Sequence, residues 1–289
     1  MDRTAKNPAF MHRMHHRIAR LGTIVVCAMA AALPAYANAL DPSTSDPNTI
    51  LHAVEASQLP ARSLARMKMT IRDQTGNRER VFSMRSKRYP DAYKRLMVIE
   101  APADSRDTAF LSVNYKSASR SNEQWVYLPK LHRVSKVANS GNADAFMGSD
   151  FTISDLSLTS QDPDKLRLKL VDQSAKVGSE ECWIIETAPR TDAMKRESGY
   201  ERMQIWVSKS KLAVLQFKGW LLGGKKTKYL KASDLRLVNG IWTPQRMNMR
   251  TLEGSKLVSE TALEFLSVDN ASAEVSDSDF TQQRLEQGA

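Results

Sequence analysis

The feature that most limits how this chain can fold is an alternation of apolar and polar side chains that recurs along most of its length. The stretch Arg66-Met67-Lys68-Met69-Thr70-Ile71-Arg72 alternates without a break, which is the two-residue period of a β-strand with one buried face. No helical pattern separates the segments of this kind, so we expect an antiparallel meander and not βαβ units. Eleven further segments carry short apolar or alternating runs, at 80–85, 95–99, 109–113, 124–128, 165–170, 182–185, 203–207, 213–217, 228–230, 245–249 and 257–265.

A meander of this length cannot stay flat. Twisted sheets of more than about ten strands close into barrels or wrap around covering elements. The sequence therefore predicts a mainly β fold: a single curved antiparallel sheet, or an incompletely closed β-barrel, of about ten to twelve strands with a helical lid.

Two segments are candidates for the lid. In the first, Asp46 is suited to be an N-cap and Pro47 to be the first helical residue, which predicts a short amphipathic helix ending near Leu59-Pro60. The second is the polar loop 138–151, followed by Thr152-Ile153-Ser154-Asp155, whose spacing is that of a capping box before a short helix. Residues 277–285 predict a last helical turn at the rim of the sheet.

Residues 1–37 have the pattern of a secretory signal peptide. Five basic residues and one acidic residue in positions 1–20 precede an apolar run, 21–33, that is too short to span a bilayer comfortably. Ala35-Tyr36-Ala37 then supplies a small-x-small cleavage site, with cleavage after Ala39 as the alternative. An uncleaved membrane anchor is the other interpretation. We expect cleavage after Ala37 and a single domain over residues 38–289.

Removal of residues 1–37 changes what the composition says about partners and stability. The formal net charge falls from +10 to +6, because five basic side chains and one acidic side chain leave. The remaining 252 residues keep one cysteine, Cys182, so no internal disulfide can form. Within the run Cys182-Trp183-Ile184-Ile185 we expect Cys182 to be a small buried hydrophobe.

The chain carries no familiar catalytic or nucleotide-binding motif. GxGxxG, P-loop, GxSxG and HExxH patterns are all absent, and Gly223-Gly224 is typical of a hairpin turn. After residue 37 only His52, His132 and Cys182 remain as soft metal ligands, too few for a tetrahedral zinc site without carboxylates. We therefore predict no enzymatic activity, no metal, no cofactor and no nucleic-acid partner.

The kinds of apolar residue on the predicted strands are more informative about function. Methionines and aromatic residues are spread over the predicted strands, and methionine adapts to irregular or changing apolar partners, as a cavity for flexible acyl chains requires. The alternative is that these residues simply pack the sheet against its helices. They are Met67, Met69, Met84, Met97, Met203, Met247, Met249, Phe82, Trp125, Tyr127, Trp183, Trp206, Trp220 and Trp242.

Two motifs carry a family resemblance. The run 124–134, which contains Trp125-Val126-Tyr127-Leu128-Pro129, and the run Phe146-Met147-Gly148-Ser149-Asp150-Phe151 occur at this spacing before Asp155-Leu156. Together they resemble the outer-membrane lipoprotein-sorting family related to LolA and LolB, and in particular the branch that accompanies transporters of the resistance-nodulation-division (RND, MMPL-type) class. The resemblance extends from the helix at Ile50-Leu51 to Phe280.

The resemblance implies a curved, incompletely closed β-barrel with helices as a lid over a hydrophobic cavity. It also implies a protein in the periplasm of a Gram-negative cell that carries lipids or lipid-anchored proteins, and we expect this protein to be a monomer. LolA itself has a cavity-lining arginine that ties the lid shut; Arg95, between apolar residues of a predicted strand, is the candidate for that role. The predicted cavity wall and lid consist of Met67, Met69, Ile71, Arg95, Leu96, Val98, Trp125, Tyr127, Leu128, Phe146, Met147 and Phe151.

Three functions follow as hypotheses. The first is a periplasmic, non-enzymatic carrier that binds the acyl chains of lipids or lipoproteins and helps to sort them to the outer membrane with an RND-type exporter. The alternative is a non-carrier accessory protein that docks to such a transporter through strand edges or the basic residues Lys225, Lys226 and Lys228. The third is a hydrolase acting on envelope lipids.

Overall fold

The computed structural model describes residues 40–117, 119–137, 143–156 and 163–286. The predicted signal peptide, 1–37, and the start of the predicted lid loop, 138–142, lie outside these ranges. In the described ranges, no helix has the length and apolar character that crossing a membrane would require.

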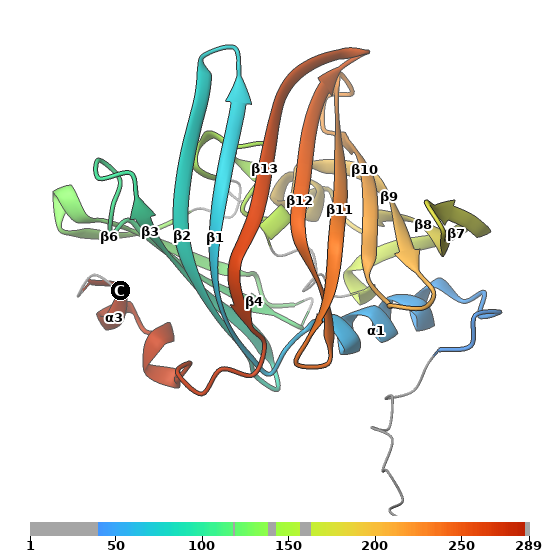
Figure 1. Ribbon diagram of the computed structural model, residues 1–289, viewed down its shortest axis with the longest axis horizontal. Helices are drawn as coiled ribbons and strands as arrows, with labels where there is room; N and C mark the ends of the chain where they lie inside the picture. Colours follow the sequence, from blue (N-terminus) through green and yellow to red (C-terminus); the bar gives the residue numbers. More distant parts are fainter. Residues whose placement is uncertain (1–39, 118, 138–142, 157–162, 287–289) are drawn as a thin grey trace, which may run out of the picture. The chain divides into compact units, whose positions relative to one another are not determined.

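Thirteen antiparallel strands form one curved sheet (Figure 1). Neighbouring strands follow the order β6-β5-β4-β3-β2-β1-β13-β12-β11-β10-β9-β8-β7, so β6 and β7 are the two edges and the sheet is not closed. The strands are β1 (Arg62–Asp73), β2 (Gly76–Arg88), β3 (Ala92–Ala101), β4 (Ala109–Tyr115), β5 (Glu123–Leu128), β6 (Arg133–Lys136), β7 (Leu166–Val177), β8 (Glu180–Pro189), β9 (Tyr200–Ser208), β10 (Val214–Leu221), β11 (Lys226–Val238), β12 (Ile241–Glu253) and β13 (Lys256–Asp269).

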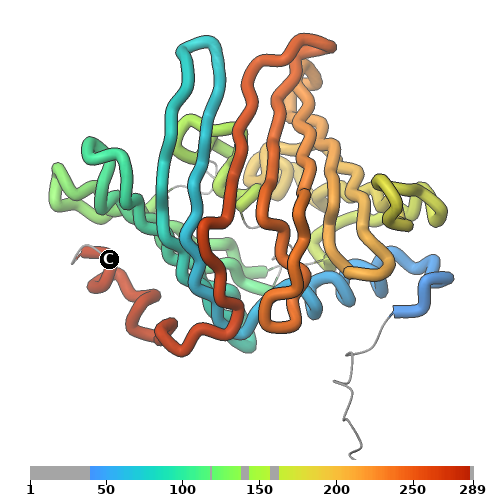
Figure 2. Tube along the Cα trace, in the orientation of Figure 1, coloured from blue at the N-terminus to red at the C-terminus, as the bar shows by residue number. Residues whose placement is uncertain are grey.

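The strand order divides the sheet into two meanders. One runs from β1 out to the edge strand β6, and the other runs from the edge strand β7 back to β13. The two join at the centre, where the cyan β1 lies beside the red-orange β13 in Figure 2 and Met69 pairs with Leu263. Residues 137–165 connect the two edges. We call the described part of this connection, residues 143–156, the crossing segment.

One face of the sheet, which we call the concave face, carries the main hydrophobic core. Helix α1 (Pro47–Gln58) packs Ile50, Leu51 and Val54 into this core. The helix starts as predicted, because the Asp46 side chain accepts hydrogen bonds from the backbone N–H groups of Asn48 (3.2 Å) and Thr49 (3.0 Å). Every strand from β1 to β3 and from β8 to β13 contributes buried side chains to the same core.

The opposite, convex face is covered at the β3–β5 end by the C-terminal residues. The 3-10 turn η6 (Asp277–Phe280) starts with a capping box between Ser276 and Asp279, and helix α3 (Gln282–Glu286) follows. Val275, Phe280 and Leu285 pack there against apolar residues of β3, β4 and β5. Both faces of β3 are therefore buried.

The predicted fold class is confirmed: a mainly β, curved and unclosed antiparallel sheet with few helices. The sheet has one strand more than the upper end of the predicted range, because the four-residue strand β6 was missed. Helix α2 (Asp192–Ser198), between β8 and β9, was also missed. Further short elements include the 3-10 turns η1 (Pro129–Leu131), η3 (Phe146–Gly148) and η5 (Pro163–Lys165).

Candidate functional site

An apolar cavity of about 130 Å³ lies between α1 and the concave face of the β7–β12 half of the sheet. Leu51 and Val54 of α1 form one wall, and Met203, Phe217 and Leu230 belong to the strands opposite. These five residues are also members of the main core, so the cavity is a gap within it. The remaining lining residues are Glu55, Gln58, Leu166, Thr187, Ile205, Ala213, Val214, Ala232, Pro244 and Met247.

Two buried polar atoms in the cavity lining lack a hydrogen-bond partner among the described residues. They are Nε2 of Gln58, at the end of α1, and Oγ1 of Thr187, on β8. An unpaired buried donor or hydroxyl costs about 1–3 kcal/mol, so natural proteins keep few of them without a reason. The cavity is thus apolar in most of its wall and has hydrogen-bonding capacity at two points.

The start of the crossing segment packs into the β1–β4 half of the concave face. Phe146 is 1% exposed and makes edge contacts with the rings of Phe82 on β2 (centroids 6.2 Å apart) and Phe110 on β4 (4.9 Å). Phe151 is buried in the same core, and the Phe146 N–H donates to the Phe151 carbonyl at 2.7 Å, which folds the segment back on itself. Among the described residues, the apolar cavity lies on the α1 side of the concave face.

Asp150 fixes the crossing segment to the centre of the sheet. Its carboxylate accepts hydrogen bonds from the hydroxyls of Thr251 (2.5 Å), Thr261 (2.7 Å) and Ser259, on β12 and β13. The Asp150 backbone N–H also donates to the Thr261 hydroxyl at 2.9 Å. Asp150 is 4% exposed, so three hydroxyls satisfy a carboxylate that is almost out of water.

A second carboxylate, Asp155, fixes the segment to the β9–β11 part of the sheet. It forms an ion pair with Lys228 (Oδ2 to Nζ, 3.2 Å) and accepts a hydrogen bond from the Tyr200 hydroxyl at 2.8 Å. It also makes the predicted capping-box pair with Thr152 in both directions. Burial and the Asp155 charge raise the pKa of Tyr200 well above its usual value. Gly219 leaves room for the Tyr200 ring.

Arg95 holds the end of the crossing segment. It lies on β3, is 4% exposed, and donates a hydrogen bond from Nη1 to the Leu156 carbonyl. Its guanidinium also lies 5.4 Å from the centre of the Tyr93 ring. Burial lowers the pKa of Arg95 from its usual value.

The structure divides the predicted site residues between the two faces of the sheet. Met67, Met69 and Ile71 are buried in the main core with Phe146 and Phe151, and Met147 packs against this core. Leu96, Val98 and Tyr127 are instead buried on the convex face, with Trp125 beside them. Leu128 is 37% exposed.

On β3 the inward-facing apolar residues are Met97 and Ile99 rather than Leu96 and Val98, so the predicted alternation was out of phase by one residue. None of the twelve predicted residues lines the α1 cavity.

The residues that line the cavity had a sequence signal, but the prediction did not use it. Leu51 and Val54 recur at helical spacing, and Met203 and Ile205 alternate on one strand. Gln58 and Thr187 had no such signal, because an isolated polar residue at the end of a helix or in a strand is usually exposed.

Lys228 does not belong to an exposed basic hairpin tip. Lys225 and Lys226 are exposed at the β10–β11 turn, where Gly223 and Gly224 adopt positive φ as the predicted hairpin requires. The Lys228 side chain is 7% exposed and points to the concave face with Leu230. Of the three lysines predicted to form a docking surface, only Lys225 and Lys226 are therefore exposed.

Cys182 is fully buried in β8, as predicted, and is a free thiol. Burial raises its pKa to about 11. In the part of the chain that the structure describes, no three His, Cys, Asp or Glu side chains gather so as to hold a metal ion.

An open antiparallel sheet that curves around an apolar cavity and is crossed by an internal segment defines a LolA-like fold, and solved structures agree. A domain from Vibrio parahaemolyticus, provisionally described as outer membrane lipoprotein-sorting, matches with a TM-score of 0.74 and 22% identity, over 85% of this chain and all of that one. A DUF1329 family protein from Desulfovibrio piger matches with a TM-score of 0.74 and 24% identity, over 82% and 97%.

A LolA superfamily protein from Nitrosomonas europaea matches with a TM-score of 0.62 and 13% identity, over 84% of this chain and all of that one. These likenesses confirm the predicted LolA/LolB-like resemblance at the level of the fold.

The chain belongs to a family described as "Uncharacterized protein"-like, whose model matches residues 91–287. Among curated proteins, none matches the chain.

Proposed function

We propose that this protein is a non-enzymatic carrier that binds the acyl chains of lipids or lipoproteins. The observation that supports this function most directly is the apolar cavity between α1 and β7–β12. Each buried methylene of an acyl chain contributes about 0.8 kcal/mol, so a cavity of this composition gains affinity from chain length without specific polar contacts.

The cavity is too small for a whole acyl chain in the closed arrangement. Its volume of about 130 Å³ is close to the ~150 Å³ of an engineered cavity that holds one benzene molecule. A longer chain therefore requires α1 to move away from the sheet. Met203 and Met247 line the cavity, and their flexible side chains can adapt to an incoming chain at low cost.

The unpaired polar atoms favour a ligand with a hydrogen-bonding group near its chain. Gln58 Nε2 is a donor and Thr187 Oγ1 is both donor and acceptor. The carbonyl of an acyl ester or amide accepts hydrogen bonds from groups of this kind. A lipid or a lipoprotein acyl group therefore suits the site better than a pure hydrocarbon.

The crossing segment is suited to control the size of the cavity. It is fixed at Asp150, at Asp155 and at the Leu156 carbonyl, where Arg95 donates. Release of the Arg95 contact would free the Leu156 end of the segment while the Asp150 cluster stays closed. This corresponds to the role of the lid-tying arginine that the family resemblance implies.

Location and partners belong to the same proposal. The basic and then apolar pattern of residues 1–37 supports export by a cleaved signal peptide, and the likeness to a lipoprotein-sorting domain supports a site of action in the periplasm. We propose that a monomer delivers its cargo to the outer membrane and works with an inner-membrane exporter of the RND class.

Native mass spectrometry of protein purified from the periplasm tests the carrier function. We expect adducts with the masses of lipids, which disappear after delipidation and return when a long-chain fatty acid is added. A protein that carries no adduct and does not displace a fluorescent fatty acid would refute the proposal.

A matched pair of variants on β11 locates the site. Ala232→Phe fills the cavity and Leu237→Phe changes a residue that is 49% exposed on the same strand. We expect at least tenfold weaker fatty-acid binding for Ala232→Phe and none of this loss for Leu237→Phe. Because overpacking costs about 1–3 kcal/mol, the melting temperature of each variant is measured alongside.

A further inference from the structure

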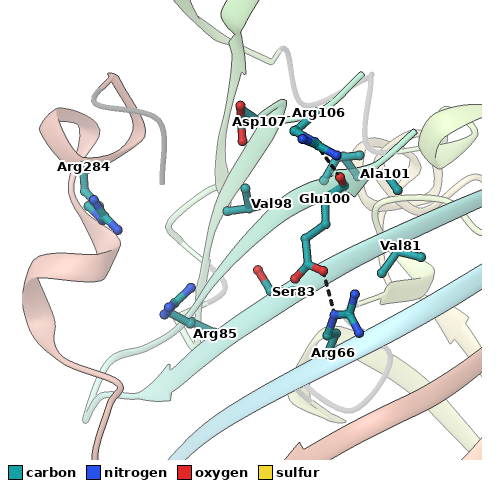
Figure 3. Close-up of a pocket in the computed structure, with 11 residues that line it drawn as sticks. Arg66, Val81, Ser83, Arg85, Val98, Glu100, Ala101, Arg106, Asp107 and Arg284 are labelled. Atoms are coloured by element: carbon teal, nitrogen blue, oxygen red, sulfur yellow. Dashed lines mark hydrogen bonds and ion pairs between the residues drawn. The ribbon is translucent and has the colours of Figure 1, made fainter. Parts of the chain in front are cut away.

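A second pocket, separate from the apolar cavity beside α1, lies on the convex face between β1–β3, the β3–β4 loop and α3. Its volume is about 690 Å³, within the ~300–1,000 Å³ range of small-molecule sites. Figure 3 shows Arg85 projecting from β2 and Arg284 extending from α3 on the other side of the same space. Packing of Phe280 and Leu285 against β3–β5 holds α3, and with it Arg284, in place.

Four of the eleven residues that line the pocket are arginines, against two carboxylates. Two of the arginines already have partners within the pocket. Arg66 forms an ion pair with Glu100 (Nε to Oε2, 2.6 Å), and Arg106 donates from Nε to the Glu100 carbonyl at 3.0 Å (Figure 3). These two arginines lie on one side of the pocket, where the Glu100 carboxylate pairs with Arg66.

The other two arginines, Arg85 and Arg284, make weaker contacts with the protein. Nε of Arg85 is buried and has no hydrogen-bond partner among the described residues. It forms a long ion pair with Asp279, with 3.7 Å between Nε and Oδ1, and this contact is not a hydrogen bond. In the described part of the chain, the Arg284 guanidinium makes neither a hydrogen bond nor an ion pair.

We propose that this pocket binds a phosphate group between Arg85 and Arg284. A planar guanidinium offers paired donors that match the oxygens of a phosphate, and two guanidinium groups facing one space are a common arrangement for this anion. The Ser83 hydroxyl lies in the lining as an additional donor, while Val81, Val98 and Ala101 offer an apolar surface to the atoms attached to the phosphate.

The same chemistry is available from free phosphate and from the headgroup of an anionic phospholipid. Isothermal titration calorimetry of the purified protein distinguishes them with three probes: inorganic phosphate, glycerol 3-phosphate and dihexanoylphosphatidylglycerol. Tighter binding of the short-chain lipid than of the two chain-free probes identifies a lipid headgroup. Equal or tighter binding of inorganic phosphate or glycerol 3-phosphate identifies a soluble phosphate.

Three variants test the assignment. Arg85→Gln and Arg284→Gln each remove one guanidinium, and Arg236→Gln is the control, because Arg236 is exposed on β11 and pairs only with nearby Asp234 among the described residues. We expect a loss of about tenfold in affinity for each of the first two variants and no change for the control.

The melting temperature of each variant shows whether it is folded. Because Arg284 is only half-buried, the affinity of Arg284→Gln tests the proposal even if Arg85→Gln is unstable. The proposal is wrong if none of the probes binds, if Arg284→Gln binds like the parent protein, or if Arg236→Gln weakens binding equally.

Discussion

The buried ion pair between Lys228 and Asp155 provides a direct test of how the crossing segment is held. The Lys228 side chain is 7% exposed and the Asp155 side chain is fully buried, with 3.2 Å between Nζ and Oδ2. At this distance, and at the effective dielectric constant of about 20 that suits protein sites, the attraction is about 5 kcal/mol. Much of it offsets the cost of taking both charges out of water.

Lys228→Met removes one partner and leaves the Asp155 carboxylate buried with only its neutral donors, Tyr200 and Thr152. Removal of one member of a buried pair typically costs about 3–5 kcal/mol. We expect a loss of this size in the free energy of unfolding, measured by urea denaturation at neutral pH. Since whole domains are stable by only about 5–15 kcal/mol, the loss is large.

The control is Lys226→Met, which removes an exposed lysine two residues earlier on the same strand and is expected to change stability by no more than about 0.5 kcal/mol. The double variant Lys228→Met/Asp155→Asn is expected to be more stable than Lys228→Met alone, because no unpaired charge remains. A loss below about 1 kcal/mol for Lys228→Met, the value of an exposed pair, would show that the reasoning is wrong.

Three further predictions follow. Gly219→Ala would place a Cβ only 2.3 Å from Cε1 of the buried Tyr200 ring, so we expect a loss of at least about 2 kcal/mol in unfolding free energy, measured by thermal and urea denaturation. Gln58→Leu removes an unpaired buried donor. It is therefore expected to leave stability equal or higher, while competition assays show weaker binding of a fatty-acid ester but not of an alkane. Because burial raises the pKa of Cys182 to about 11, iodoacetamide at pH 8 is expected to label the native protein far more slowly than the urea-unfolded protein, as followed by mass spectrometry.

The sequence predicts side-chain direction well where one face of a strand meets water. On β1, charged residues such as Arg66 and Lys68 alternate with Met67 and Met69, and the structure places the two methionines in the core. On β3 the run from Leu96 to Ile99 is buried throughout. There the C-terminal residues cover the convex face, so no exposed side chain marks the phase of the strand.

The position of the cavity could not be predicted for a related reason. The methionine-rich composition indicated adaptable apolar space, but Phe146 of the crossing segment packs against Phe82 and Phe110 and fills the β1–β4 half. Which half stays empty depends on contacts between residues far apart in the chain. The same is true of Lys228, which has the sequence context of a hairpin tip and becomes internal only because Asp155 lies opposite.

The pairing of the first strand with the last has a consequence for the order in which the chain folds. Leu64 lies opposite Asp269, so the central seam of the sheet forms only after nearly the whole chain is available. Contacts between residues so distant in sequence are slow to form, because a long loop must close first. Until β13 pairs with β1, one edge of β1 is free, and its backbone N–H and C=O groups lack partners on that side. The two meanders are not yet joined by strand pairing. A chain that lost its last strand would keep every residue of the α1 cavity lining and yet lack the seam that makes the two halves one sheet.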